Sequence, residues 1–278
     1  LGKTTETIAI LAIVFLFALH TAGLIARWYI SGHAPWSDGY ESMIYVAWAT
    51  MFFGLLFSKK SALTLAATTF VASILLMVAH LSWMDPAIAN LQPVLNSYWL
   101  KVHVAIIVAS YGPFVLGMVL GLVALVLMIF TKAGNKDKLD LHIKELTYIN
   151  EMALTVGLVM LTIGNFLGGM WANESWGRYW GWDPKETWAL ISIMAYAFVI
   201  HMRLVPGLRG RFAYNLASVI AIAFIIFTYF GVNFYLSGLH SYQSGQKIDS
   251  LKSISVAVGL LILIAVLAYR KYKQYYKK

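Results

Sequence analysis

The stretch WANESWGRYWGWDPKETW, Trp171 to Trp188, decides how the rest of the chain is interpreted. It holds five Trp, one Tyr and five charged residues in eighteen positions, and long apolar runs flank it on both sides. Because charged side chains are costly in a bilayer core, the stretch connects two spans rather than forming one. An aromatic belt at the membrane interface explains one or two of these Trp residues. Five in one connection favour an aromatic platform with charged edges, suited to a large planar ligand.

The composition is that of an integral membrane protein. Of 278 residues, 60% are hydrophobic and 12% are charged, whereas soluble domains carry roughly 25% charged residues. The chain has no Cys, which excludes disulfides, thiolate metal sites and a redox relay through its own thiols. We therefore expect an all-α, polytopic fold, with residues 1–278 forming a single transmembrane domain.

Eight apolar segments approach the roughly 20 residues that a transmembrane helix needs. They are approximately 7–28, 42–58, 61–82, 99–130, 147–170, 186–203, 213–237 and 252–270. With this arrangement, 15 of the 21 Lys and Arg residues fall on one face, as the positive-inside rule predicts for the cytoplasmic side. Both termini then lie inside, and the Trp-rich connection lies on the outer face. The net charge of +9 thus reflects the orientation of the chain in the membrane and does not indicate a nucleic-acid partner.

Within the Trp-rich stretch, the sequence also predicts the start of a helix. Asp183 fits an N-cap, Pro184 the first helical position, and Glu186 the third position of a capping box. A structural role and a direct functional role explain these three residues equally well. Trp176 and Trp180 share a face if the segment between them is helical. The cations available to a ligand carboxylate are Arg178 and Lys185.

Two further patterns concern the packing of the helices. Gly112-Pro113 predicts a kink in the fourth span, because proline removes a backbone hydrogen bond. Gly164 and Gly168 form a small-xxx-small pair that lets helices approach closely.

The seven histidines are candidate ligands for a metal centre. Four fall on the predicted outer face with the Trp-rich stretch: His33, His80, His103 and His240. The others are His20 in the first span, His201 near the inner end of the sixth, and His142 in the predicted inner loop 131–146. Two neutral imidazoles can hold a haem iron from opposite faces. Topology alone leaves open which pair of the outer four does so.

The run WGRYWGWDPKETWAL, residues 176–190, resembles the WWD signature of the haem-handling proteins of cytochrome c maturation. It looks most like the CcsA or ResC type of the System II pathway. The likeness extends from Tyr40-Glu41-Ser42, through LNSYWLKVHV at 95–104, to GLHSY at 238–242, and so covers most of the chain.

The resemblance implies an outer haem b site with His103 and His240 as axial ligands, and His201 as a ligand within the membrane. The residues that it assigns to the haem surface are Trp171, Trp176, Gly177, Arg178, Tyr179, Trp180, Trp182, Asp183, Pro184, Lys185, Glu186 and Trp188. His33 and His80 then have structural or auxiliary roles.

The same resemblance implies a haem-binding subunit of the cytochrome c synthase, a haem lyase of the inner membrane with its haem site facing the periplasm. It would attach haem to the CxxCH segment of apocytochrome c. Its partners would be a CcsB-like membrane subunit and proteins that keep the substrate thiols reduced. The alternatives are a System I-like haem exporter or chaperone, and a scaffold that docks a membrane protein without a cofactor.

One departure from the family concerns the inner haem, whose second ligand comes from CcsB. The sequence lacks that portion, and its start at Leu1 suits either a trimmed terminus or the C-terminal part of a CcsBA fusion. Whether His20 substitutes for the missing ligand stays open.

Overall fold

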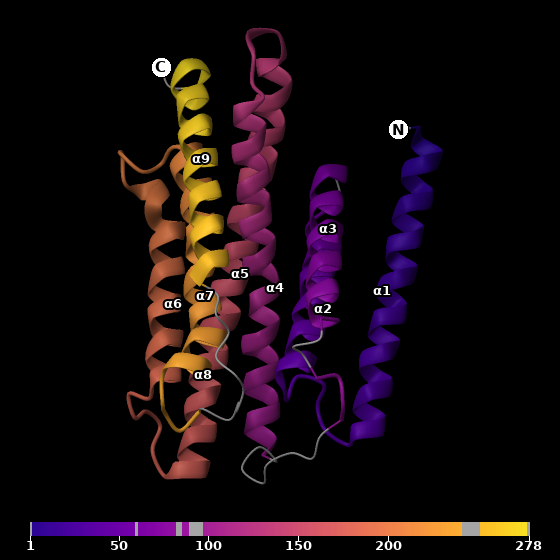
Figure 1. The fold of residues 1–278 in the computed structure, drawn as a ribbon, viewed down its shortest axis with the longest axis vertical. Helices are drawn as coiled ribbons and strands as arrows, with labels where there is room; N and C mark the ends of the chain where they lie inside the picture. Colours follow the sequence, from indigo (N-terminus) through magenta and orange to yellow (C-terminus); the bar gives the residue numbers. More distant parts are fainter. Residues whose placement is uncertain (1, 59–60, 82–84, 89–96, 241–250, 277–278) are drawn as a thin grey trace. The chain divides into compact units, whose positions relative to one another are not determined.

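The computed structural model describes residues 2–58, 61–81, 85–88, 97–240 and 251–276 (Figure 1). Within these ranges every regular element is a helix. The long helices are α1 (Lys3–Ser31), α2 (Gly39–Phe57), α3 (Ala62–Ala79), α4 (Tyr98–Ile129), α5 (Lys136–Trp176), α6 (Pro184–His201), α7 (Arg211–Ile226) and α9 (Leu251–Tyr275). The short elements are η2 (Ala133–Asn135), η3 (Met202–Leu204), the π-helix η4 (Phe227–Gly231) and α8 (Val232–Tyr235).

Among the described residues, eight helical segments are long and apolar enough to cross a membrane, with α7, η4 and α8 forming one of them. This confirms the predicted all-α, multi-pass fold.

The predicted inner loop 131–146 is largely helical, and this part of the prediction is wrong. Helix α5 already begins at Lys136 and continues to Trp176, so it includes both His142 and the start of the Trp-rich stretch. Its first turns, KDKLDLHIKEL, hold three Lys and three Leu, which favour helix. An ion pair between Lys144 and Asp140, one turn apart, spans 2.8 Å. The helix therefore continues into polar sequence that hydropathy alone treats as a connection.

The chain divides into two compact units. The first unit comprises residues 1–113 and 163–179, and the second comprises 114–162 and 180–278. The boundary within α4 follows Pro113, the proline inside that helix.

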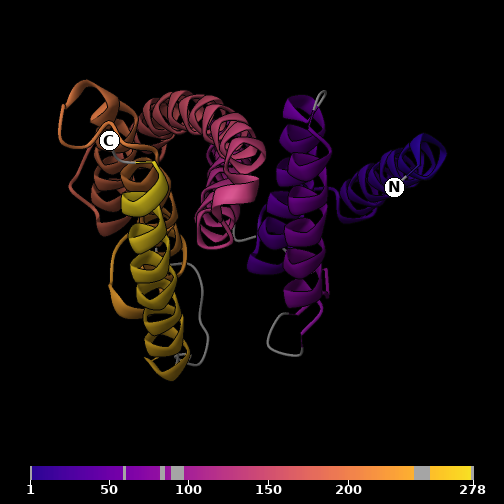
Figure 2. The ribbon, with the colours of Figure 1, turned by 90° about the horizontal axis from the view of Figure 1, so that it is seen from above.

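In the first unit, small residues allow helices to pack closely. Helices α2 and α3 run side by side (Figure 2). A Cβ added to Gly112 of α4 would lie 2.7 Å from the backbone of Ala49 in α2, and one at Gly164 of α5 would lie 2.6 Å from Ile107. The predicted packing role of Gly164 is thereby confirmed.

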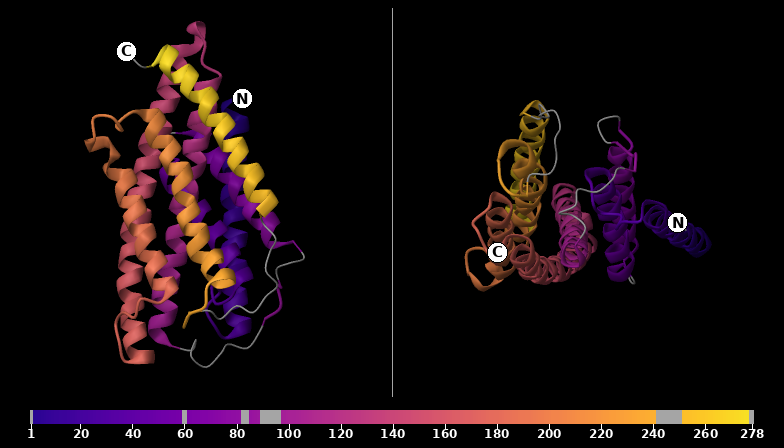
Figure 3. Two further views of the ribbon diagram at one scale, coloured as in Figure 1. Left: turned by 60° about the vertical axis from the view of Figure 1, so that its left-hand side comes forward. Right: turned by 90° about the horizontal axis from the view of Figure 1, so that it is seen from below.

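In the second unit, buried polar side chains connect the helices. Asn150 of α5 donates to Ser218 of α7 at 2.9 Å, and Asn215 donates to Thr147 at 2.8 Å. Such bonds replace water for polar groups within a membrane. Helix α6 packs against α7 (Figure 3). The ring of Phe212 in α7 lies 5.2 Å from that of Tyr269 in α9.

Candidate functional site

The Trp-rich stretch is a helix end, a short loop and a helix start. Helix α5 ends at Trp176, and Gly177 takes the left-handed conformation (φ 71°) that favours glycine after a helix. The Gly177 N–H donates to the carbonyl of Asn173 at 2.9 Å. Because the helix stops there, the condition under which Trp176 and Trp180 share a helical face is not met. The aromatic residues are therefore presented by two helix ends and the loop between them.

His103 lies in the first unit, near the start of α4. Its Nδ1 is 2.8 Å from the carbonyl oxygen of Trp99, one turn earlier. A carbonyl oxygen only accepts, so Nδ1 carries the proton and Nε2 carries the lone pair that binds a metal. The imidazole stacks on Trp171 at a centroid distance of 5.4 Å. A Cβ at Gly168 would lie 3.3 Å from the imidazole ring, so α5 approaches His103 where a side chain would crowd it.

The aromatic contacts continue from His103 toward a cation in the same unit. Trp171 meets Trp176 edge to face at 4.7 Å. The guanidinium carbon of Arg178 lies 5.6 Å from the Trp176 ring centroid, within range of a cation–π interaction. Tyr179, the next residue, is 60% exposed. One side of the unit therefore joins a candidate ligand, two indoles and a guanidinium in one connected set.

Asp183 is the hub of the second unit's part of the site. The predicted capping box is confirmed: Asp183 is the N-cap of α6, Pro184 opens the helix, and Glu186 accepts from the Asp183 N–H at 3.2 Å. The Asp183 carboxylate also accepts from the N–H of Leu239 at 2.6 Å and from Nδ1 of His240 at 2.8 Å. The structural and the functional explanation of Asp183 are thus compatible, because the same carboxylate caps α6 and binds Leu239 and His240.

The charges of Asp183 and His240 follow from their surroundings. Burial raises the pKa of the Asp183 carboxyl, but the Lys185 N–H, the charge and hydrogen bond of His240 and the Leu239 N–H together lower it below its ordinary value. Burial lowers the pKa of His240, and the Asp183 carboxylate only partly opposes this. At neutral pH the pair is therefore an ionised carboxylate and a neutral imidazole. Nδ1 of His240 donates to the carboxylate, which places the lone pair on Nε2, the arrangement that metal-ligating histidines adopt.

Gly238 is a site residue that sequence reasoning missed. A Cβ added there would overlap the Asp183 carboxylate and lie 2.9 Å from Cδ of Pro184. The bond between Asp183 and His240 thus requires a residue without a side chain two positions before His240. Gly238 is part of the GLHSY segment quoted above. The sequence alone does not show that this glycine lies against Asp183, which is distant in the chain.

We expect Gly238→Ala to lower the free energy of unfolding by about 1–3 kcal/mol, the usual cost of overpacking. The same variant should lose the Asp183–His240 hydrogen bond. Thermal unfolding in detergent and the NMR titration of His240 measure the two effects. Gly259→Ala is the matched control, because a Cβ at Gly259 meets nothing within 4 Å. Equal stability of the two variants would contradict the assigned packing.

The loop between the two helices holds its indoles in an uncommon backbone conformation. Trp182 has φ 59°, a left-handed value that is unusual for a bulky residue. It brings the N–H groups of Gly181 and Asp183 to the same oxygen of Glu186, at 2.8 and 3.2 Å. The Trp182 side chain is 71% exposed and meets Trp180 edge to face at 5.7 Å. The capping carboxylate of Glu186 thus stabilises a turn that presents an indole to the surroundings.

Lys185 and Trp188 contact neighbouring helical residues. The Lys185 ammonium donates to Asn233 at 2.8 Å and lies 5.5 Å from the Tyr229 ring centroid. Trp188 packs on Phe227 at 4.1 Å, and its carbonyl accepts from Thr228 at 3.1 Å. These contacts attach α6 to η4 and α8, so the assignment of Lys185 to a ligand carboxylate stays a prediction.

The remaining histidines occupy separate places. His201, exposed at the end of α6, has Nδ1 2.7 Å from the Ala197 carbonyl, which leaves the lone pair on Nε2. His33 is buried, with Nδ1 3.8 Å from the fully buried carboxylate of Glu41. That carboxylate also pairs with Arg27 at 2.8 Å, consistent with a structural role for His33. His80 is the C-cap of α3.

Each unit thus gathers its own subset of the predicted site. The first unit brings His103, Trp171, Trp176 and Arg178 into one connected set. The second joins Asp183, Glu186 and His240 through hydrogen bonds.

Comparison with known proteins relates the chain to proteins of cytochrome c assembly. The family model described as "Cytochrome C assembly protein" matches residues 36–240. Protein NrfI of Wolinella succinogenes is 53% identical over 254 residues, which are 91% of this chain and 28% of NrfI. The cytochrome c biogenesis protein CcsA of Chlamydomonas reinhardtii is 37% identical over 79% of this chain and 64% of its own length. CcsA of Synechococcus sp. (strain CC9902) is 36% identical over 81% of this chain and 83% of its own. The chain therefore spans about a quarter of NrfI and less than two thirds of the algal CcsA.

Proposed function

This chain belongs to the cytochrome c assembly protein family, and from that membership we propose that it holds haem b for covalent attachment to apocytochrome c. His103 and His240 are the proposed axial ligands of haem at the outer face, and the WWD segment 171–188 is the surface on which the porphyrin lies. His201 is the proposed ligand of haem within the membrane. A CcsB-like subunit and thiol-reducing proteins complete the proposed system.

The observation that most supports this proposal is the hydrogen bonding of the two histidines. Each directs Nδ1 to an acceptor, Trp99 in one case and Asp183 in the other, at 2.8 Å. Both therefore carry the Nε2 lone pair that iron requires, in fixed ring orientations. His103 also lies within a connected set of indoles that ends at a guanidinium, matching the apolar face and charged edge of haem.

The proposed contribution of the protein is positioning. Haem is the substrate, and each cysteine thiol of the CxxCH segment adds across one vinyl group, with the sulfur bonding to one carbon and the proton ending on the other. Such additions accelerate when the reacting groups are held in a productive orientation. The two imidazoles fix the porphyrin, the aromatic side chains exclude water from its faces, and Arg178 orients its carboxylates. With no Cys in its 278 residues, the chain relies on other proteins to keep the substrate thiols reduced.

The alternative is a haem exporter or chaperone that delivers haem without attaching it. Reconstitution of the full chain with haem, reduced apocytochrome c and the CcsB-like subunit separates the two functions. The synthase proposal expects a covalent product whose haem stays with the cytochrome after acid–acetone extraction. Haem that binds the chain but extracts completely from the cytochrome would favour the exporter.

Arg178→Ala is expected to weaken haem retention by about tenfold, because a charge-assisted hydrogen bond to a propionate is lost. Arg178→Lys should retain part of the affinity, since lysine keeps the charge but not the bidentate geometry. Lys252→Ala is the control for the lost charge, because that residue is exposed on the predicted outer side. Haem titration of the purified variants measures the effect, and normal retention in Arg178→Ala would leave the proposed contact unsupported.

A further inference from the structure

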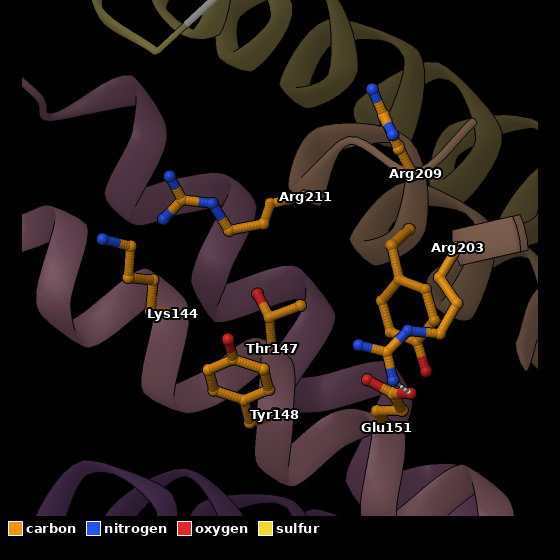
Figure 4. A pocket seen from close by; sticks show the side chains of 8 residues that line it. Lys144, Thr147, Tyr148, Glu151, Arg203, Arg209 and Arg211 are labelled. Atoms are coloured by element: carbon orange, nitrogen blue, oxygen red, sulfur yellow. Dashed lines mark hydrogen bonds and ion pairs between the residues drawn. The ribbon is translucent and has the colours of Figure 1, made fainter. Parts of the chain in front are cut away.

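A cavity of about 270 Å³ lies in the second unit where α5, η3 and α7 meet. Helix α5 contributes Lys144, Thr147, Tyr148 and Glu151, the η3 region contributes Arg203 and Arg209, and α7 contributes Arg211 and Tyr214. Figure 4 shows these side chains around the cavity, with Arg203 directed to Glu151. None of them belongs to the proposed haem surface.

The lining is strongly basic. Four cationic side chains line the cavity together with one carboxylate, Glu151, which pairs with Arg203. Lys144 and Arg211 share a second carboxylate, Asp140, at 2.8 and 2.7 Å. The cations therefore outnumber the carboxylates that accompany them. Because an anion is attracted to such an excess of positive charge, the cavity favours an anionic ligand.

The second observation is a buried hydroxyl that also lines the cavity. Tyr214 is 6% exposed, and its hydroxyl has no hydrogen-bond partner among the described residues. Buried polar groups in native proteins nearly always find a partner, so an unsatisfied one calls for an explanation. An acceptor oxygen of a bound ligand would satisfy this hydroxyl.

A third feature is the start of α7. Its N-cap is Gly210, which provides no side-chain cap, and cavity-lining residues lie on both sides of it in sequence, Arg209 and Arg211. The first N–H groups of a helix favour anions through their own donors and the helix dipole.

We propose that this cavity binds a phosphate group, as a phosphodiester of an anionic phospholipid headgroup or as a free phosphate. Tetrahedral phosphate oxygens can accept from several guanidinium groups and from the Tyr214 hydroxyl at once. Arg203, Arg209 and Arg211 of the lining lie at or next to the ends of two candidate spans, Pro184–Leu204 and Arg211–Tyr235, and basic pockets near the ends of spans can bind lipid headgroups. The positive-inside rule accounts for the basic residues in this region, but it requires neither a cavity nor a buried hydroxyl without a partner. The proposal does not depend on the haem function.

Native mass spectrometry of the delipidated full chain tests the proposal, with phosphatidylglycerol or phosphatidylcholine added back. Thermal unfolding with inorganic phosphate alone forms the second arm. Arg209→Gln and Tyr214→Phe are each expected to weaken binding by about tenfold. Tyr214→Phe should leave the melting temperature of the ligand-free protein unchanged or higher, because it removes an unsatisfied hydroxyl. Arg270→Gln and Tyr269→Phe, both exposed on α9, are the matched controls.

Selective retention of phosphatidylglycerol, lost in the two cavity variants alone, supports a lipid headgroup. Stabilisation by inorganic phosphate that disappears in the same variants supports a free phosphate. The proposal is overturned if neither ligand binds the wild-type chain, or if the controls weaken binding as much as the cavity variants. It is also overturned if the cavity variants lose haem in parallel with lipid, since the site would then serve the haem carboxylates.

Discussion

Replacing either His103 or His240 with Ala is expected to abolish holocytochrome formation. Each substitution removes one proposed iron ligand, and the remaining imidazole alone does not fix the porphyrin plane. Haem retention by the purified protein should fall with each substitution, and free imidazole should restore part of both haem retention and activity by occupying the vacated position. Covalent haem on a co-expressed apocytochrome c measures activity, and the Soret absorbance of the purified protein measures retention.

The controls for this experiment are the other two histidines predicted on the outer face. His33 lies beside the buried Glu41, and His80 caps α3. His33→Ala and His80→Ala should therefore keep haem and activity, provided that the variants fold. Unchanged haem content and activity in both His103→Ala and His240→Ala would exclude these two residues as the ligands.

Asp183→Asn is expected to reduce haem affinity by about 10- to 100-fold, the usual consequence of losing the carboxylate that orients a ligating histidine. The substitution separates the two functions of Asp183, because Asn caps a helix about as well as Asp. The amide loses the negative charge opposite His240, and its single oxygen cannot serve all three donors, the N–H groups of Lys185 and Leu239 and Nδ1 of His240. Haem titration at neutral pH measures the change.

Asp38→Asn is the matched control for Asp183→Asn. Asp38 is the N-cap of α2, and its carboxylate accepts from the Glu41 N–H at 2.7 Å. Both variants should keep their helices, but only Asp183→Asn should lose haem affinity. If Asp183→Asn bound haem as tightly as the wild-type protein, the Asp183–His240 bond would be structural only.

The spans and the start of α6 were predictable because both depend on local sequence. Hydropathy fixes the transmembrane helices through the length of apolar runs, and Asp183-Pro184 with Glu186 specifies a helix start through contacts three residues apart. Local sequence was less informative at the ends of α5. Its polar first turns lack the hydropathy of a span, and its last residue, Trp176, lies within the stretch interpreted as a loop.

The parts of the site that escaped prediction depend on contacts between residues far apart in sequence. Asp183 contacts Leu239 and His240 only in the folded chain. Gly238 is needed because a side chain at that position would overlap the Asp183 carboxylate. Residue propensities likewise do not predict the left-handed conformation of Trp182, because bulky residues rarely adopt it. The resemblance did point to His240, but the carboxylate that orients it required the structure.

The central claim is that one haem iron is held by His103 and His240. Electron paramagnetic resonance of the purified, haem-loaded protein tests it most directly, in a His201→Ala background that removes the proposed membrane ligand. The account predicts a low-spin signal of two imidazole ligands, converted to a high-spin signal by His103→Ala and by His240→Ala separately. A low-spin signal that survives both substitutions would contradict it.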